Sequence, residues 1–444
     1  MTSLKSIALC ALISLSTPLR SQTIESLPGR TVERATAGED TSQAFAVYYP
    51  SGYSEASKWP LLFVMDPRGR AMVALRLFAP AAEKHGFVVV SSYNTLSDGE
   101  VEPNIGAANA MLTAAQTTIA ADMTRLYIAG FSGTARIAWS IELEAPKIFG
   151  GILSAGAAPI FNDSAGSRGL LHAPGFAIAL TTGTMDFNAA EVRRARSWLR
   201  SERVPVRVEE YAGPHSWPPA PLIEHALAWF RLRGMLGGRW PMDSAWVKLR
   251  LTEEAKRADS IAALGKLLDA AEIYEDLDEL AGSFAGSDFG ARAKELAMNP
   301  AVLSARKRLI EFDTRYLSRK AQMSVYFATI DAKDAPPTRE EIIRALDITG
   351  LKKMAAESDS LEKQWAQRML SLVGVMLGFY QPRTYLDLKR PLQAISMLEA
   401  SSALAPLGPG QCAMLSQALA GLTDDERRKL EEKTQPLSAS CGGT

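Results

Sequence analysis

Short runs of consecutive hydrophobic residues alternate with longer helical patterns over the first half of the chain. The runs with strand character cover residues 44–50, 59–67, 86–94, 126–130, 150–156, 175–183 and 204–211. The segments with helical character cover residues 105–120, a stretch from 133 onward, 189–202 and 222–233. Short hydrophobic strands without alternation are buried on both faces, so interleaving them with helices indicates a parallel sheet covered on both sides. The pattern predicts one doubly wound, mostly parallel α/β domain over residues 30–234.

The pattern changes at residues 234–243, where glycines and a proline interrupt it. From there onward helical periodicity dominates and strand signals almost vanish. Thr338 with Glu341, and Thr423 with Glu426, have the spacing of helix capping boxes. We therefore expect the second half of the chain to be helical.

Two neighbouring helical segments, residues 390–406 and 408–422, are similar to the helix–turn–helix pairs of tetratricopeptide repeats. No period is clean enough to count repeats. The expectation is an all-helical domain over residues 243–435, of which a short tetratricopeptide-like solenoid is one form.

The first 22 residues have the pattern of a secretory signal peptide. Lys5 supplies a positive charge, a hydrophobic run extends from Ile7 to Leu15, and small or polar residues follow as far as Ser21. The run is too short to span a bilayer, and a buried first helix is the alternative. No other segment reaches transmembrane length. We expect a secreted or periplasmic protein without a membrane span once the signal is removed.

The cysteine count fits such export. Of three cysteines, Cys10 lies inside the predicted signal peptide, whose removal leaves Cys412 and Cys441. In an oxidising compartment these two either pair and tie down the C-terminal tail or remain free thiols. Two cysteines are too few to frame a disulfide-rich fold.

The length and the charge of the chain bear on the number of domains and on nucleic-acid binding. The chain has 444 residues, which predicts at least two domains, and 47% of them are hydrophobic. Its 49 basic residues balance its 49 acidic residues, and no long run of charge stands out. A broad nucleic-acid interface is therefore not expected.

The segment G-F-S-G-T, residues 130–134, carries the strongest chemical signal. A strand-like run precedes Ser132 and a helical pattern follows it, as in the sharp turn that exposes a nucleophilic serine. Such a turn favours small residues two positions before and after the serine. Gly130 satisfies this, whereas Thr134 is β-branched and predicts a slightly crowded elbow, so that Thr134→Gly should leave activity intact or raise it. The alternative is a tight turn with an idle serine.

A nucleophilic serine needs a histidine base and an acid that orients it, in the chain order serine, acid, histidine. Asp186 follows the strand-like run 175–183, although an aspartate there could equally cap the next helix. Asp163 competes with it but follows an earlier strand. His215 follows the run 204–211 and is the best-placed base. The other histidines precede a strand or lie within a loop or a helix: His85, His172 and His225.

An oxyanion hole needs two backbone N–H donors. Gly133, directly after the serine, would supply one. The other should come from the loop after the strand 59–65. Pro67 has no N–H, so Arg68 is the predicted second donor; the alternative is that this loop only turns the chain.

Three motifs, G-F-S-G-T-A-R, T-G-T-M-D and G-P-H-S-W-P, together resemble the α/β-hydrolase superfamily. The resemblance is greatest to secreted esterases related to polyhydroxybutyrate depolymerases and feruloyl esterases, and it covers about the first half of the chain. It implies a triad of Ser132, Asp186 and His215, a small-molecule or polymeric carboxylic ester as substrate, and no metal or organic cofactor. Thr134, Pro214 and the D-P-R-G-R loop depart from the family pattern and leave the substrate class open.

Two other functions fit the same residues. In the first, the hydrolase domain is catalytically inactive and the helical half binds a protein partner. In the other the triad acts as a peptidase or an acyltransferase.

Overall fold

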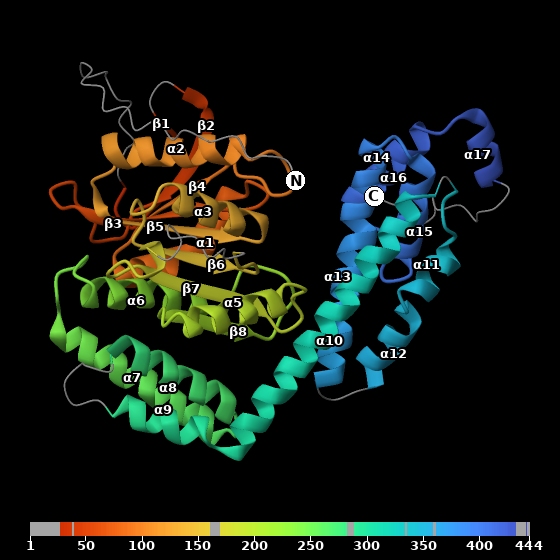
Figure 1. Cartoon of the computed structure of the whole chain (residues 1–444). Coiled ribbons are helices and arrows are strands. Elements are labelled where there is room, and N and C mark those ends of the chain that lie inside the picture. The colour runs from red at the N-terminus through yellow and green to blue at the C-terminus, as the bar shows by residue number, and fades with distance from the viewer. Residues whose placement is uncertain are drawn as a thin grey trace. The chain divides into compact units, whose positions relative to one another are not determined.

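The computed structural model describes residues 27–37, 40–159, 169–281, 288–333, 335–357, 361–431 and 441 (Figure 1). The predicted signal peptide and Asp163 lie outside these residues. The chain forms two compact units. Unit 1 holds the described residues up to Gly183, Glu191–Tyr211 and His215–Ala305; unit 2 holds Thr184–Ala190, Ala212–Pro214 and the described residues from Arg306 onward.

Unit 1 is built on an eight-stranded sheet (Figure 1). Its strands are β1 (Thr31–Ala37), β2 (Asp40–Tyr48), β3 (Trp59–Met65), β4 (Val88–Ser92), β5 (Ala121–Phe131), β6 (Gly151–Ala155), β7 (Ala177–Gly183) and β8 (Val206–Tyr211). They lie in the order β1-β2-β4-β3-β5-β6-β7-β8. Strands β3 to β8 run parallel to one another. Strand β2 pairs antiparallel with β4, and β1 pairs antiparallel with β2. All residues of β4, β6 and β7 are buried, as expected for strands covered on both faces.

Helices cover both faces of the sheet. These helices are α1 (Ala71–His85), α2 (Glu102–Thr117), α3 (Gly133–Glu144), α5 (Ala189–Ser201) and α6 (Ala220–Leu236). One hydrophobic cluster joins the sheet to α1 and α6, and a second joins it to α2, α3 and α5. The predicted doubly wound, mostly parallel sheet is confirmed; β1 is the strand that the hydrophobic pattern did not predict.

Three further helices also belong to unit 1: α7 (Ser244–Ala263), α8 (Leu267–Ala281) and α9 (Phe289–Ala297). Their hydrophobic residues join the α1 and α6 cluster. Ion pairs add to this contact, because buried Arg207 of β8 lies 2.7 Å from Glu254 of α7 and 2.8 Å from Glu209. The predicted boundary at residues 234–243 falls between α6 and α7, but the compact unit continues to Ala305. The domain ranges 30–234 and 243–435 thus stay a prediction.

Among its described residues, unit 2 is helical. Its helices are α10 (Pro300–Asp331, mostly in this unit), α11 (Arg339–Ala345), α12 (Ile348–Glu357), α13 (Leu361–Val375), the π-helix η1 (Met376–Tyr380), α14 (Gln381–Asp387), α15 (Pro391–Ser402), α16 (Pro409–Ala420) and α17 (Asp424–Glu431). They share one hydrophobic core. Both predicted capping boxes form, at Thr338 with Glu341 and at Thr423 with Glu426. The helical prediction is confirmed, while its tetratricopeptide-like form stays a prediction.

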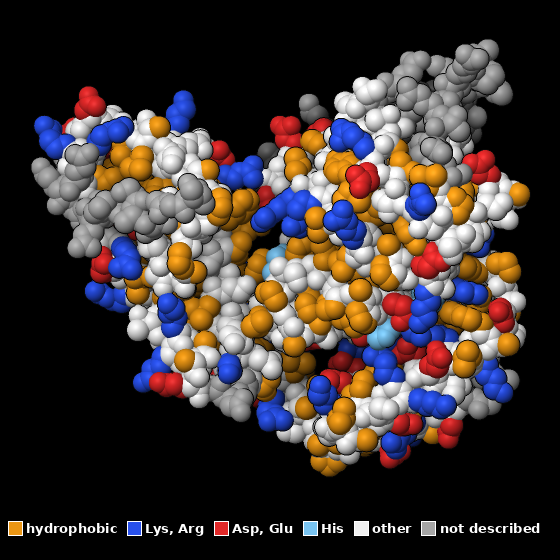
Figure 2. All heavy atoms as spheres, turned by 180° about the vertical axis from the view of Figure 1, so that it is seen from behind, with side chains coloured by type: hydrophobic (Ala, Val, Ile, Leu, Met, Phe, Trp, Pro, Cys, Tyr) orange, Lys and Arg blue, Asp and Glu red, His pale blue; other side chains and the backbone are white. Residues whose placement is uncertain are grey.

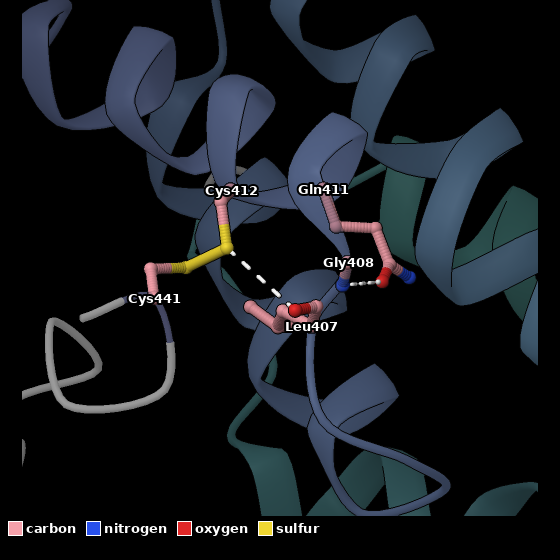
Figure 3. Close-up of a disulfide and its surroundings, with 5 residues drawn as sticks. All are labelled: Leu407, Gly408, Gln411, Cys412 and Cys441. Carbon is pink, nitrogen blue, oxygen red and sulfur yellow. Dashed lines mark hydrogen bonds between the residues drawn. A yellow bond between two sulfur atoms is a disulfide. The ribbon is translucent and has the colours of Figure 1, made fainter. Parts of the chain in front are cut away.

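Cys412 and Cys441 form a disulfide in unit 2 (Figure 3). Cys412 lies in the first turn of α16, which begins after Gly408, whose N–H donates to Gln411 Oε1 at 2.9 Å. The bond ties Cys441 to α16 across a sequence separation of 29 residues. Of the two alternatives for these thiols, the paired state is the one observed.

Two further properties of the described residues are their membrane-spanning potential and the distribution of charge on their surface. No helix among them has both the length and the hydrophobicity needed to cross a bilayer. On the face seen in Figure 2, basic and acidic side chains are interspersed over the surface.

Candidate active site

Ser132 lies at a sharp turn between β5, which ends at Phe131, and α3, which begins at Gly133. Its φ of 57° and ψ of −122° are strained for a residue with a side chain, which is typical of a nucleophile elbow. A Cβ atom at Gly130 would lie 2.5 Å from the carbonyl oxygen of Thr134. A Cβ atom at Gly133 would lie 2.5 Å from Ser97 Cβ. Glycine at both positions therefore allows the close approach that the turn requires.

Thr134 is fully buried and has a hydrogen-bonding role in the elbow. Its hydroxyl lies 2.6 Å from the carbonyl oxygen of Met65 and 2.9 Å from that of Phe131. It also accepts a hydrogen bond from the Phe131 N–H at 3.2 Å. The side chain joins the end of β3 to the end of β5. The expectation of a merely crowded elbow is corrected accordingly.

His215 lies in the loop after β8, and its Nε2 is 2.8 Å from Ser132 Oγ. The imidazole ring packs against Phe131 with centroids 4.6 Å apart. The loop is fixed from the strand side, because the Tyr211 hydroxyl donates to the carbonyl oxygen of Ser216 at 2.6 Å. The structure thus brings together two predicted residues 83 positions apart. A histidine at this distance can take the serine proton as a general base.

Trp217 connects the histidine loop to the loop after β3. Its ring packs against Phe131 and Phe78, with centroids 5.6 and 5.4 Å apart. Its indole N–H donates to Asp66 Oδ2 at 2.9 Å. This hydrogen bond ties the histidine loop to the loop after β3.

Asp66 is buried at the end of β3 and collects several donors. Arg70 Nε and Nη2 each lie 3.0 Å from one of its carboxylate oxygens. Burial raises the pKa of Asp66, but the hydrogen bonds from Arg70, Trp217 and the Arg68 backbone outweigh it, so that the pKa is lowered. Asp66 therefore remains an ionised anchor. Sequence reasoning missed Asp66 and Trp217, although both lie inside the motifs D-P-R-G-R and G-P-H-S-W-P.

The two predicted oxyanion donors differ in their surroundings. Gly133 is the first residue of α3, so its N–H has no acceptor within the helix. The Arg68 N–H instead donates to Asp66 Oδ1 at 2.9 Å. An oxyanion would have to compete with that carboxylate for it. The Arg68 N–H is thus engaged by Asp66 in this structure, and its role as the second oxyanion donor stays a prediction.

Asp186 lies three residues after β7 and belongs to unit 2. It is fully buried, and its Oδ1 accepts a hydrogen bond from the Asn188 N–H at 2.7 Å. The Met185 N–H donates to the carbonyl oxygen of Gly213 at 2.9 Å. Since Gly213 precedes His215 by two residues, this bond ties the acid's loop to the chain that leads to the histidine. The pairing of Asp186 with His215 is a proposal, given below.

Among the described residues, no group of three or more His, Cys, Asp or Glu side chains is arranged to hold a metal ion.

No protein-family model matches the sequence, and no curated protein matches it significantly. Solved structures resemble about half of the chain. A ferulic acid esterase is 12% identical with a TM-score of 0.37, and the match covers 48% of this chain and 100% of the esterase. An S-formylglutathione hydrolase from Agrobacterium tumefaciens is 16% identical with a TM-score of 0.35, covering 49% and 100%. A feruloyl esterase module from Clostridium thermocellum is 12% identical with a TM-score of 0.37, covering 46% and 88%.

The strand order and the strained serine at the turn after β5 together identify the fold of the first half. Unit 1 has an α/β-hydrolase fold. The assignment rests on these features of the chain itself, and the histidine after β8 adds to them.

Proposed function

We propose that this protein is a serine hydrolase that cleaves carboxylic esters through an acyl-enzyme. The observation that supports it most is the 2.8 Å distance between His215 Nε2 and the hydroxyl of Ser132, on a strained strand-to-helix turn. A serine hydroxyl is a weak nucleophile until an adjacent base removes its proton. The pair meets that need without further rearrangement.

In the proposed reaction, Ser132 Oγ attacks the ester carbonyl while its proton passes to His215. The imidazolium then gives the proton to the leaving alcohol, and the acyl group stays on the serine. Water, deprotonated by His215, attacks the acyl-enzyme and releases the acid. Asp186 orients the imidazole and stabilises its charged form. The Gly133 N–H stabilises the oxyanion, and Arg68 contributes only if its N–H leaves Asp66.

A fluorophosphonate probe tests the nucleophile directly. We expect the wild-type protein to be labelled and Ser132→Ala to stay unlabelled. Ser140→Ala is a matched control, because Ser140 lies on α3, the helix that follows Ser132, and its hydroxyl donates to the Arg136 carbonyl oxygen. This control should be labelled like the wild type. A wild-type protein that resists the probe would contradict the proposal and favour an inactive hydrolase with a partner-binding helical part.

The substrate class needs a separate experiment. We propose a small-molecule or polymeric ester, and p-nitrophenyl esters of graded acyl length would define the acyl pocket. Faster cleavage of amides would indicate a peptidase instead. Transfer of the acyl group to an added alcohol in preference to water would indicate an acyltransferase.

We further propose export to an oxidising compartment, either the periplasm or the exterior of the cell. The disulfide between Cys412 and Cys441 supports this, because such bonds persist mainly in oxidising compartments. We expect the exported protein to have been cleaved near residue 22, so that the N-terminal segment is missing. We also expect it to show no free thiol unless it is reduced. Intact mass and thiol titration measure both. An exported chain with an intact N-terminus and two free thiols would refute this assignment.

A further inference from the structure

The acid loop, defined as Thr184–Ala190, is held by two buried side chains of unit 2. Arg368 of α13 is 1% exposed, and its Nε and Nη2 donate to the carbonyl oxygen of Thr184 at 3.2 and 2.8 Å. Tyr316 of α10 is fully buried, and its hydroxyl donates to the carbonyl oxygen of Phe187 at 2.7 Å. The two helices therefore fix the loop on both sides of Asp186, two residues before it and one residue after it.

Burying the charged guanidinium of Arg368 costs desolvation energy, so an arginine at this position needs a reason. Its Nη1 lies 3.4 Å from Asp313, and its charge lies over the rings of Phe312 and Tyr316 at 4.9 and 5.8 Å. These contacts offset part of the desolvation cost. A hydrophobic side chain could fill the same core without that cost. What arginine adds is a pair of donors aimed at one carbonyl oxygen of the acid loop.

A backbone hydrogen bond within unit 2 also holds the acid loop. The Met185 N–H donates to the carbonyl oxygen of Gly213, just before His215 in the chain. These hydrogen bonds, at Thr184, Met185 and Phe187, help to define where the loop lies. A catalytic group must be held within a fraction of an ångström, because a misplacement of about 1 Å costs about 100-fold in rate.

We propose that Arg368 and Tyr316 are positioning residues for Asp186, the acid of the proposed triad. This inference rests on the proposed function. It gives the helical part a role in turnover that requires no protein partner.

The test uses the full-length chain with Tyr316→Phe, Arg368→Met and Arg368→Lys. Tyr316→Phe removes a single hydroxyl, so it remains informative even if Arg368→Met fails to fold. We expect a fall in kcat of about 10-fold or more for Tyr316→Phe and Arg368→Met, with KM nearly unchanged, and partial recovery in Arg368→Lys. Tyr326→Phe is the matched control, because Tyr326 lies on the same helix and packs against the same core. It should keep wild-type turnover.

A double-mutant cycle separates positioning from simple destabilisation. In an Asp186→Asn background, Tyr316→Phe should cause no further loss of kcat, because the acid that it positions is already absent. A merely structural residue would reduce kcat by the same factor in both backgrounds.

The possible results discriminate between the two proposals. Wild-type turnover that depends on Ser132 and Asp186 but is unaffected by Tyr316→Phe and Arg368→Met would overturn this inference alone. Equal losses in both backgrounds would overturn it as well. A wild type that neither reacts with fluorophosphonate nor cleaves esters would overturn the proposed function and this inference with it.

Discussion

At the scale of single residues, Thr134 shows how a departure from a motif acquires a reason. Elbow patterns favour a small residue here, yet the threonine hydroxyl bonds to the ends of two strands. We expect Thr134→Val to keep the shape and leave the Phe131 N–H and the Met65 carbonyl oxygen without this partner. The expected loss is about 1–3 kcal/mol in the free energy of unfolding.

Urea unfolding and ester turnover measure the effect, and Thr134→Ser is the control that retains the hydroxyl. Thr134→Gly should be destabilised and less active, the reverse of what the motif alone suggests. A Thr134→Val protein as stable and as active as the wild type would show that the hydroxyl has no such role.

The sequence predicted the residues with local signatures and missed those that depend on tertiary contact. Ser132 directly follows β5 and His215 lies in the loop after β8, so both could be predicted from strand-like runs in the sequence. The bond from Trp217 to Asp66 joins residues 151 positions apart, on loops after strands that are not neighbours in the sheet. The use of the Arg68 N–H by Asp66 is likewise set by a loop conformation that composition does not reveal.

At the scale of elements, the ion cluster between β8 and α7 explains why α7 belongs to unit 1. Glu254 of α7 is buried and pairs with Arg207, Arg250 and Arg257 at 2.7, 2.9 and 3.0 Å. Burial raises the pKa of Glu254, but the three arginines outweigh it and lower the pKa to about 2. Helical periodicity alone carries no sign of this cluster.

Replacing Glu254 with glutamine should leave the buried Arg207 short of one counter-charge. We expect a loss of about 3–5 kcal/mol in the free energy of unfolding at neutral pH. The folded pKa lies below the unfolded value, so the ionised carboxylate stabilises the fold above about pH 4.5 and this contribution is lost as the pH falls toward 2. The difference between wild type and variant should therefore shrink over that interval.

Urea unfolding at a series of pH values checks this expectation. Glu253→Gln is the matched control, because Glu253 is more exposed and lies 3.4 Å from Arg250 alone. It should change stability by no more than about 0.5 kcal/mol. A Glu254→Gln protein with a pH-independent loss would argue against an ionised glutamate in the cluster.

At the scale of the whole molecule, the division into units changes what a truncation would mean. A chain that ends after residue 240 loses α7 and α8, including buried Val247, Leu251 and Leu277. Burial of such side chains contributes about 1.5–3 kcal/mol each. The sum approaches the 5–15 kcal/mol that is roughly the whole stability of a domain. We expect this fragment to be insoluble or unfolded, so its inactivity would say nothing of catalysis.

A chain that ends after residue 305 keeps those helices and the ion cluster of β8, but it lacks Tyr316 and Arg368. We expect it to be soluble, with the far-ultraviolet circular dichroism of an α/β protein, and still able to react slowly with fluorophosphonate at Ser132. Its ester turnover should fall to the level of full-length Asp186→Asn, because the acid loop has lost the hydrogen bonds from Tyr316 and Arg368. Full turnover by this fragment would show that catalysis does not need the helices after residue 305 and would leave them free for another function, such as binding a protein partner.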